Sequence, residues 1–171
     1  TEDGGQTWTE LPRLNLPRLT GVKFFDPTNG IAFGECAPLA PAGVFTTRDG
    51  GNTWLPAATD YSAAWLAGDF LAADFGALAG PAGQLATFTR GKVTHSPLAA
   101  SSLRSFRAMR LAAPTGGWAV GDGGLVMTTH DAGRSWQTPP ADLPAFATES
   151  FDFHALAVQG SHVWVAGTPG T

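Results

Sequence analysis

The sequence predicts an all-β fold, a β-propeller of four-stranded antiparallel blades, on three observations. Glycine contributes 22 and proline 13 of the 171 residues, which breaks the chain too often for long helices. Hydrophobic residues make up 43% of the chain and charged residues only 14%, so the composition suits a packed core and not a disordered chain. Motifs also recur every 41 to 46 residues, which is the period of a propeller blade.

One repeated motif is an eight-residue turn with the pattern Ser/Thr-x-Asp-x-Gly-x-Ser/Thr-Trp. It occurs as TEDGGQTW, TRDGGNTW and THDAGRSW, at residues 1–8, 47–54 and 129–136. Its aspartates, Asp3, Asp49 and Asp131, are 46 and then 82 residues apart, and 82 is twice 41. A degenerate copy is therefore expected near residue 90. The segment LATFTRGK at 85–92 fits that place, with Arg90 instead of the aspartate, so it keeps the strand pattern and loses the turn chemistry.

The other strands of each unit follow from a second repeat that precedes the first. Glycine-bounded apolar runs, expected to be second strands, recur at intervals of 46, 41 and 46 residues, at 30–34, 76–80, 117–121 and 163–167. First strands are expected in the apolar runs ahead of them, at 21–25, 68–72, 105–111 and 151–158. Third strands are expected just before the Asp turns, at 44–47, 85–88 and 125–129. Each fourth strand is expected to begin at the Trp that ends the turn. Residues 122–124, Asp-Gly-Gly, are expected to turn between a second and a third strand.

These units make residues 1–171 a single propeller segment with three full blades and two partial ones. The full units span about 19–58, 61–99 and 103–140, and the partial blades span about 1–14 and 150–171. Seven steps join Gly167 to Asp3 through the two chain ends, whereas ten join Gly121 to Asp131. The two ends are thus short of one closing blade, which favours roughly half of a larger ring over a closed four-bladed one.

The repeated turn has a structural rationale. An Asp side chain accepts hydrogen bonds from backbone amides just after it, and a Gly permits the positive φ of a tight turn. The closing Trp buries its ring and donates its indole N–H to an acceptor. Catalytic or calcium-binding aspartates are the alternative, but a ring holds the three copies on separate blades. We therefore predict structural roles for the Asp, Gly and Trp of each copy: Asp3, Gly5, Trp8, Asp49, Gly51, Trp54, Asp131, Gly133 and Trp136.

The turn motif resembles the Asp-box, or bacterial neuraminidase repeat (BNR), of sialidases, sortilins and other propellers, and its three copies extend the resemblance over essentially the whole chain. The longer string WAVGDGGLVMTTHDAGRSW at 118–136 resembles the repeat unit of the photosystem II stability/assembly factor family. In that family the propeller is a protein-binding scaffold. The resemblance therefore implies a non-enzymatic scaffold for a protein partner, in a periplasmic, lumenal or secreted location.

A candidate partner-binding patch comes from the basic residues. Arg104, Arg107 and Arg110 form a close cluster, and Lys23 aligns with Arg110 at an offset of 87 residues. The first strand of each propeller blade lines the central channel, where arginines are suited to bind anionic groups of a partner. The family resemblance also implies a basic patch. Solvated arginines at strand ends are the alternative interpretation.

A sialidase-like or other glycoside hydrolase is the alternative function. Sialidases use an arginine cluster, a Tyr nucleophile and an acid/base carboxylate. The segment FRAM at 106–109 faintly resembles the Phe-Arg-Ile-Pro segment of sialidases but lacks its Pro, and the single tyrosine, Tyr61, lies in a connection between blades. We therefore assign no catalytic residue. Hydrolysis would need residues that lie partly outside this segment.

Two tryptophans and one loop are further candidates for recognition. Trp65 and Trp164 are candidates for stacking on a sugar, so a glycan ligand stays open. Trp164 aligns with the second strands and is expected to pack between blades. Trp65 and the Pro-rich segment 36–41 are less constrained by the repeat, and such loops often carry recognition.

Composition argues against several other classes of function. Ten basic and fourteen acidic residues give a net charge of −4, without the concentrated basic face that nucleic acid requires. No apolar run approaches the roughly 20 residues of a membrane-spanning helix. The single cysteine, Cys36, excludes an internal disulfide, and the four histidines are scattered along the chain. We therefore expect no metal, no cofactor, no nucleic-acid partner and no transmembrane segment.

Overall fold

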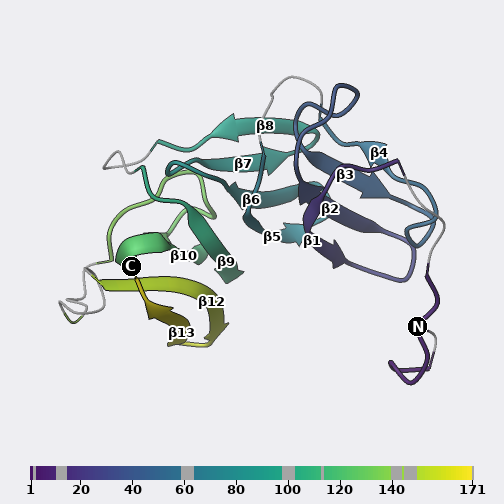
Figure 1. Cartoon of the computed structure of the whole chain (residues 1–171). Helices are drawn as coiled ribbons and strands as arrows, with labels where there is room; N and C mark the ends of the chain where they lie inside the picture. Colours follow the sequence, from purple (N-terminus) through teal and green to yellow (C-terminus); the bar gives the residue numbers. More distant parts are fainter. Residues whose placement is uncertain are drawn as a thin grey trace.

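The chain forms successive antiparallel β-sheets (Figure 1). The computed structural model describes residues 1, 3–10, 15–58, 64–97, 103–112, 114–139, 144 and 150–170. The first sheet contains four strands in chain order: β1 (Leu19–Phe24), β2 (Gly30–Gly34), β3 (Val44–Thr47) and β4 (Leu55–Pro56). The second repeats this order: β5 (Ala67–Ala72), β6 (Phe75–Ala79), β7 (Leu85–Thr89) and β8 (Lys92–His95).

The third and fourth sheets begin in the same way but contain fewer strands among the described residues. The third contains β9 (Phe106–Ala112), β10 (Gly116–Gly121) and β11 (Val126–Thr129), with the short 3-10 turn η1 (Asp122–Gly124) between β10 and β11 as predicted. Its fourth position is a single bridge between Thr128 and Gln137. The fourth sheet pairs β12 (Phe151–Gln159) with β13 (His162–Pro169).

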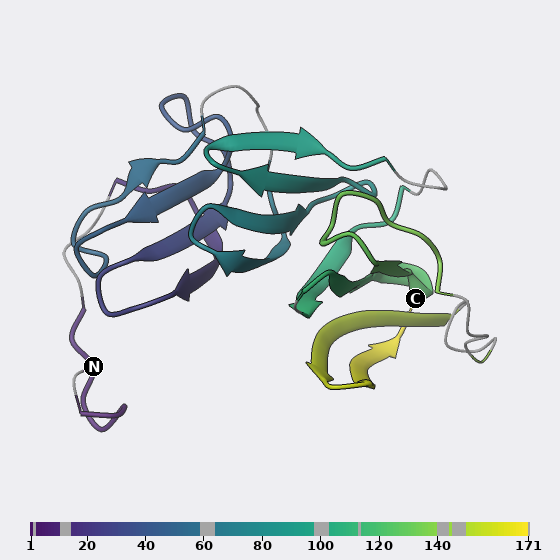
Figure 2. The same cartoon turned by 180° about the vertical axis from the view of Figure 1, so that it is seen from behind.

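The four sheets follow one another along an arc, as the opposite views of Figures 1 and 2 both show. Their first strands lie side by side: β5 packs against β1 and β9, and β9 packs against β12. Hydrophobic clusters fill the spaces between neighbouring sheets. One joins the first and second sheets, another the second and third, and a third the last two.

The strand positions confirm the repeat. β3 occupies 44–47 as expected, and β2 occupies 30–34. The degenerate box also behaves as expected, because β7 and β8 flank a two-residue turn in which Arg90 and Gly91 both have positive φ, 49° and 81°. The fourth strand of the first sheet, β4, contains two residues, whereas β8 of the second sheet contains four. The amide of Ala57 still donates to the carbonyl of Val44 at 2.9 Å, so the pairing with β3 continues past Pro56.

The two tryptophans considered as candidates for stacking on a sugar, Trp65 and Trp164, have different surroundings. Trp65 is fully buried between the first and second sheets and donates its indole N–H to the carbonyl of Ala42 at 2.8 Å, so it is not available for stacking on a ligand. Trp164 is 53% exposed and stacks on His162, with ring centroids 5.7 Å apart. Its equivalents Ile31 and Ala77 pack against the following sheet, whereas the sheet that contains Trp164 is the last one among the described residues.

A bulge recurs at one place in three of the sheets. The pairing of the first and second strands shifts by one residue at Thr20, Arg107 and His154, next to the end of the second strand. At this place the chain at the first strand lies very close to the last glycine of the second strand. A Cβ added to that glycine would overlap backbone atoms of the neighbouring chain segment. These glycines are Gly34, Gly121 and Gly167. In these three sheets the last glycine of the second strand is therefore required by the bulge opposite it.

Candidate functional site

The first strands of all four sheets line one cavity with a volume of about 620 Å³. β1, β5, β9 and β12 each contribute side chains to it. The three bulge residues, Thr20, Arg107 and His154, all line this cavity. Bulges re-aim side chains in this way and are common beside functional sites. We call this surface the channel face.

Three of the four predicted patch residues lie on the channel face: Lys23, Arg107 and Arg110. Arg104 does not line the cavity among the described residues. It donates from Nη1 to the carbonyl of Gly123 at 2.6 Å, outside the strands that form the wall.

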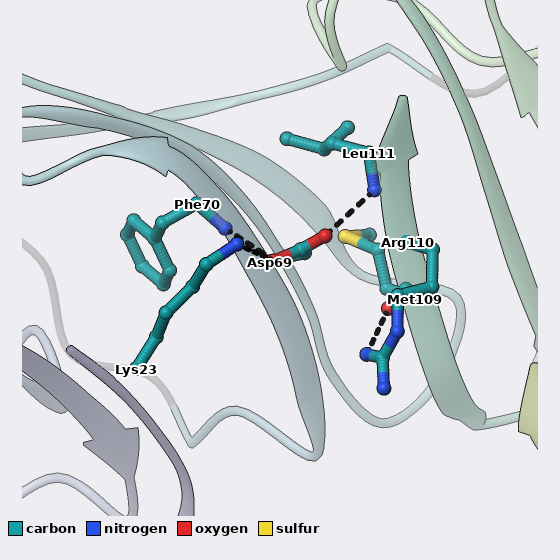
Figure 3. Close-up of polar contacts among 6 residues, drawn as sticks. All are labelled: Lys23, Asp69, Phe70, Met109, Arg110 and Leu111. Atoms are coloured by element: carbon teal, nitrogen blue, oxygen red, sulfur yellow. Dashed lines mark hydrogen bonds and ion pairs between the residues drawn. The ribbon is translucent and has the colours of Figure 1, made fainter. Parts of the chain in front are cut away.

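Sequence reasoning missed Asp69, which lies on the channel face between two of these cations. Its Oδ1 accepts from the Lys23 ammonium at 2.7 Å and from the amide of Phe70 at 2.9 Å, and its Oδ2 accepts from the amide of Leu111 at 3.0 Å. Figure 3 shows the carboxylate between the Lys23 side chain and β9. The available signal was a single charge in the apolar run 68–72, spaced 46 residues after Lys23 and 41 before Arg110.

Arg107 is also neutralised by a carboxylate. Its Nε and Nη2 donate to the two carboxylate oxygens of Asp122, each at 2.8 Å, in the bidentate geometry that favours guanidinium–carboxylate pairs. The hydrogen bond to Asp122 holds the pKa of Arg107 above its ordinary value, with a smaller contribution from the charge of Asp152. The amide of Gly123 donates to Asp152 at 2.7 Å, so the turn at 122–124 links the third sheet to β12.

Arg110 differs from both. Its Nη1 donates to a neutral acceptor, the carbonyl of Met109, at 2.9 Å (Figure 3). No carboxylate of the described residues lies within 4.0 Å of its guanidinium. Because a guanidinium has five N–H donors, Arg110 offers the channel face an uncompensated cation.

The three box motifs form nearly identical hydrogen-bond networks away from the cavity. In the second copy, Asp49 accepts from the Thr47 hydroxyl at 2.8 Å and from the amide and hydroxyl of Thr53 at 2.9 and 2.6 Å. Asp3 and Asp131 accept the equivalent bonds. Each Trp donates to the carbonyl of its box glycine, and those glycines have φ of 93°, 92° and 90°: Gly5, Gly51 and Gly133. Each aspartate is thus bonded within its own turn.

Burial differs among the boxes and affects their electrostatics. Burial acts to raise the pKa of Asp131, but the hydroxyl and amide of Ser135 and the hydroxyl of Thr129 outweigh it, so that pKa lies below its ordinary value. The Thr7 hydroxyl and amide lower the pKa of Asp3 in the same way. All three carboxylates are therefore charged at neutral pH.

We expect Asp49 to make the stability of the chain depend on pH in acid. Hydrogen bonds from the Thr53 hydroxyl, the Thr53 amide and the Thr47 hydroxyl lower the pKa of Asp49 from 3.8 to about 2. Because the folded-state pKa is the lower one, this contribution is complete above about pH 4 and is lost as the pH falls towards about 2. The urea midpoint should fall over this range, and less steeply in Asp49→Asn. Parallel curves for the two proteins would contradict a stabilising carboxylate.

The described residues contain no group of three or more His, Cys, Asp or Glu side chains placed to hold a metal ion. No helix in the described part of the chain is long and apolar enough to cross a membrane. Tyr61, the single tyrosine of the chain, lies outside the described residues.

Solved structures with the same arrangement of sheets are β-propellers. A structure of YCF48 bound to a D1 peptide is 24% identical, with a TM-score of 0.56 over 75% of this chain and 45% of that one. YCF48 from Cyanidioschyzon merolae is 17% identical, with a TM-score of 0.64 over 91% of this chain and 49% of that one. An ancestral GH74 enzyme is 12% identical, with a TM-score of 0.62 over 97% of this chain and 26% of that one. The chain has a β-propeller fold.

The propeller segment therefore spans less than half the length of these solved structures. No family model matches it, and no curated protein matches it in sequence. The sheets described above correspond to blades, and the channel face corresponds to the wall formed by the innermost strands of the propeller. The predicted fold class is confirmed.

Proposed function

We propose that this propeller segment is a non-enzymatic scaffold that binds a protein partner at its channel face. The observation that carries the proposal is Arg110, a cation on the wall of a 620 Å³ cavity without a carboxylate partner among the described residues. Arginine suits such a site because its planar donors bind a carboxylate with two parallel hydrogen bonds.

The likeness to known propellers supports a peptide segment as the bound species. YCF48 is a photosystem II assembly factor, and one of its structures contains a D1 peptide. By analogy of fold, we assign the partner-binding role here to the channel face, with Arg110 as the main contact and Lys23 and Arg107 beside it. The box residues are assigned a structural role in the blade turns, and Arg104 a role at the edge of the wall.

The glycoside hydrolase alternative is favoured by the likeness to a GH74 enzyme and is disfavoured by the carboxylates of the channel face. Most glycoside hydrolases need a pair of carboxylates that flank the scissile bond. Among the described lining residues, Asp69 is the one carboxylate, and it is bonded to Lys23 and two backbone amides. Asp122, near the wall, is bonded to Arg107.

The test measures partner recovery from an extract of the native host with the full-length protein as bait. Arg110→Ala should reduce recovery of the partner at least about tenfold, since central arginines are frequent hot spots of interfaces. Arg90→Ala is the matched control, because Arg90 is exposed on the β7–β8 turn and should leave recovery unchanged. Equal recovery with both variants would refute the channel-face site. Turnover of a fluorogenic glycoside panel by the same protein would refute the non-enzymatic assignment.

A further inference from the structure

Three charged residues occupy equivalent places on the innermost strands. Lys23, Asp69 and Arg110 lie on β1, β5 and β9, so the wall presents a cation, an anion and a cation in successive blades. Their cross-strand partners are equivalent residues of the repeat: Ile31, Ala77 and Trp118. The alternation makes Asp69 the charge that divides the two cations.

Asp69 is held in place from both sides. Its side chain is only 11% exposed, and two backbone amides from different blades, Phe70 and Leu111, donate to its two oxygens. A carboxylate fixed by such bonds cannot turn away from its cation without leaving buried amides unsatisfied. The Lys23 side chain is 42% exposed and places its ammonium 2.7 Å from Asp69. Lys23 therefore reaches the cavity already neutralised.

We propose that Asp69 neutralises Lys23 as an internal ion-pair partner. As a result, the channel face binds only one anionic group of the ligand. That group is a single carboxylate, bound by Arg110, such as one acidic side chain or a chain terminus. The inference rests on the proposed function, because it names the ligand chemistry of the same site. It makes Asp69 a residue that determines specificity without itself contacting the anion.

The expected effect of each substitution on anion affinity follows from the charge that it removes. Asp69→Asn exposes the charge of Lys23 and should favour anions with two charges. Lys23→Met exposes the charge of Asp69 and should disfavour every anion. The double variant Lys23→Met/Asp69→Asn removes a neutral pair, so its binding should return to that of the natural protein. If Lys23 instead binds the ligand directly, the double variant loses affinity as the single variant does.

The experiment titrates the full-length protein with acetate, succinate and inorganic phosphate and follows the side-chain Nε–H resonances of arginine by NMR. We expect acetate to shift Arg110, and Arg110→Ala to abolish the response. Asp69→Asn should bind succinate and phosphate about two- to fivefold more tightly, and Lys23→Met should bind all three anions about two- to fivefold more weakly, as for partly exposed charge pairs. Lys92→Met and Asp74→Asn are controls, because both residues are exposed outside the cavity.

The outcomes separate the two proposals. If acetate leaves Arg110 unshifted in the natural protein, the anion site of the proposed function fails. If acetate shifts Arg110 but the natural protein, Asp69→Asn and the double variant bind the three anions with the same preferences, only the role of Asp69 fails. Should Asp69→Asn unfold, Lys23→Met still tests the inference, because it keeps every amide bond to Asp69 and leaves this carboxylate without its cation. Unchanged anion binding in Lys23→Met would then overturn the inference.

Discussion

Gly121→Ala is expected to lower the free energy of unfolding by about 3 kcal/mol or to prevent folding, because no space exists for the added methyl group. An ideal Cβ at this position overlaps the carbonyl oxygen of Ser105 and lies 2.8 Å from the Cα of Phe106. Both are backbone atoms where the chain enters β9, and they cannot rotate aside as a side chain does. Relief would require β9 to move away from β10 at the bulge.

Gly116→Ala is the matched control on the same strand. A Cβ there lies 3.6 Å from the carbonyl oxygen of Ala112, an ordinary contact, so the change should stay within about 0.5 kcal/mol. Urea denaturation followed by tryptophan fluorescence measures both variants. Similar stability for Gly121→Ala and Gly116→Ala would show that the bulge does not depend on glycine. A folded Gly121→Ala protein should also show altered Arg107 resonances, since Arg107 is the bulge residue.

Trp136→Ala is expected to destabilise the chain by about 3–5 kcal/mol, the usual cost of removing a large buried aromatic side chain. Trp136 is 2% exposed and packs with Ala77 and Leu85 of the second blade, so its ring belongs to the interface between two blades. Its indole N–H donates to Gly133 at 3.0 Å. The substitution therefore removes a blade contact together with a turn bond.

Trp8→Ala separates these two losses. Trp8 makes the same indole bond, to Gly5 at 3.1 Å, but its side chain is 78% exposed. Its removal should change the unfolding free energy by no more than about 0.5 kcal/mol. Thermal unfolding monitored by circular dichroism gives both values. Equal effects of Trp8→Ala and Trp136→Ala would mean that the box tryptophan acts through the turn alone and not through packing between blades.

The blade pattern was predictable because it is local and repeated. The Asp turn fixes where a third strand ends, and the bounding glycines fix where a second strand lies, so β2 and β3 fall where expected. The degenerate box at Arg90 also marks a turn between two strands. A Gly follows it, and the pair forms the hairpin turn with positive φ that replaces the Asp-centred turn.

The channel face was predictable only in part, because it depends on contacts between strands far apart in sequence. Arg107 and Arg110 are three residues apart, and a regular strand would place them on opposite faces. The bulge at Arg107 changes the alternation, so both line the cavity. The pairing of Lys23 with Asp69 across two blades has no local signature. Neither does the capture of Arg107 by Asp122, which leaves Arg110 as the exposed cation.

The recurring bulge also affects how the channel face can evolve by substitution. The bulge carries a hydroxyl at Thr20, a guanidinium at Arg107 and an imidazole at His154. Each lies next to the equivalent closely packed glycine of its own sheet. Since the bulged residue stands outside the regular ladder, its identity can vary while the ladder is preserved. Three of the four sheets thus provide a position on the channel face whose side chain can change while the strand pairing is kept. Ligand preference can diverge by single substitutions at these positions, without redesign of the blade.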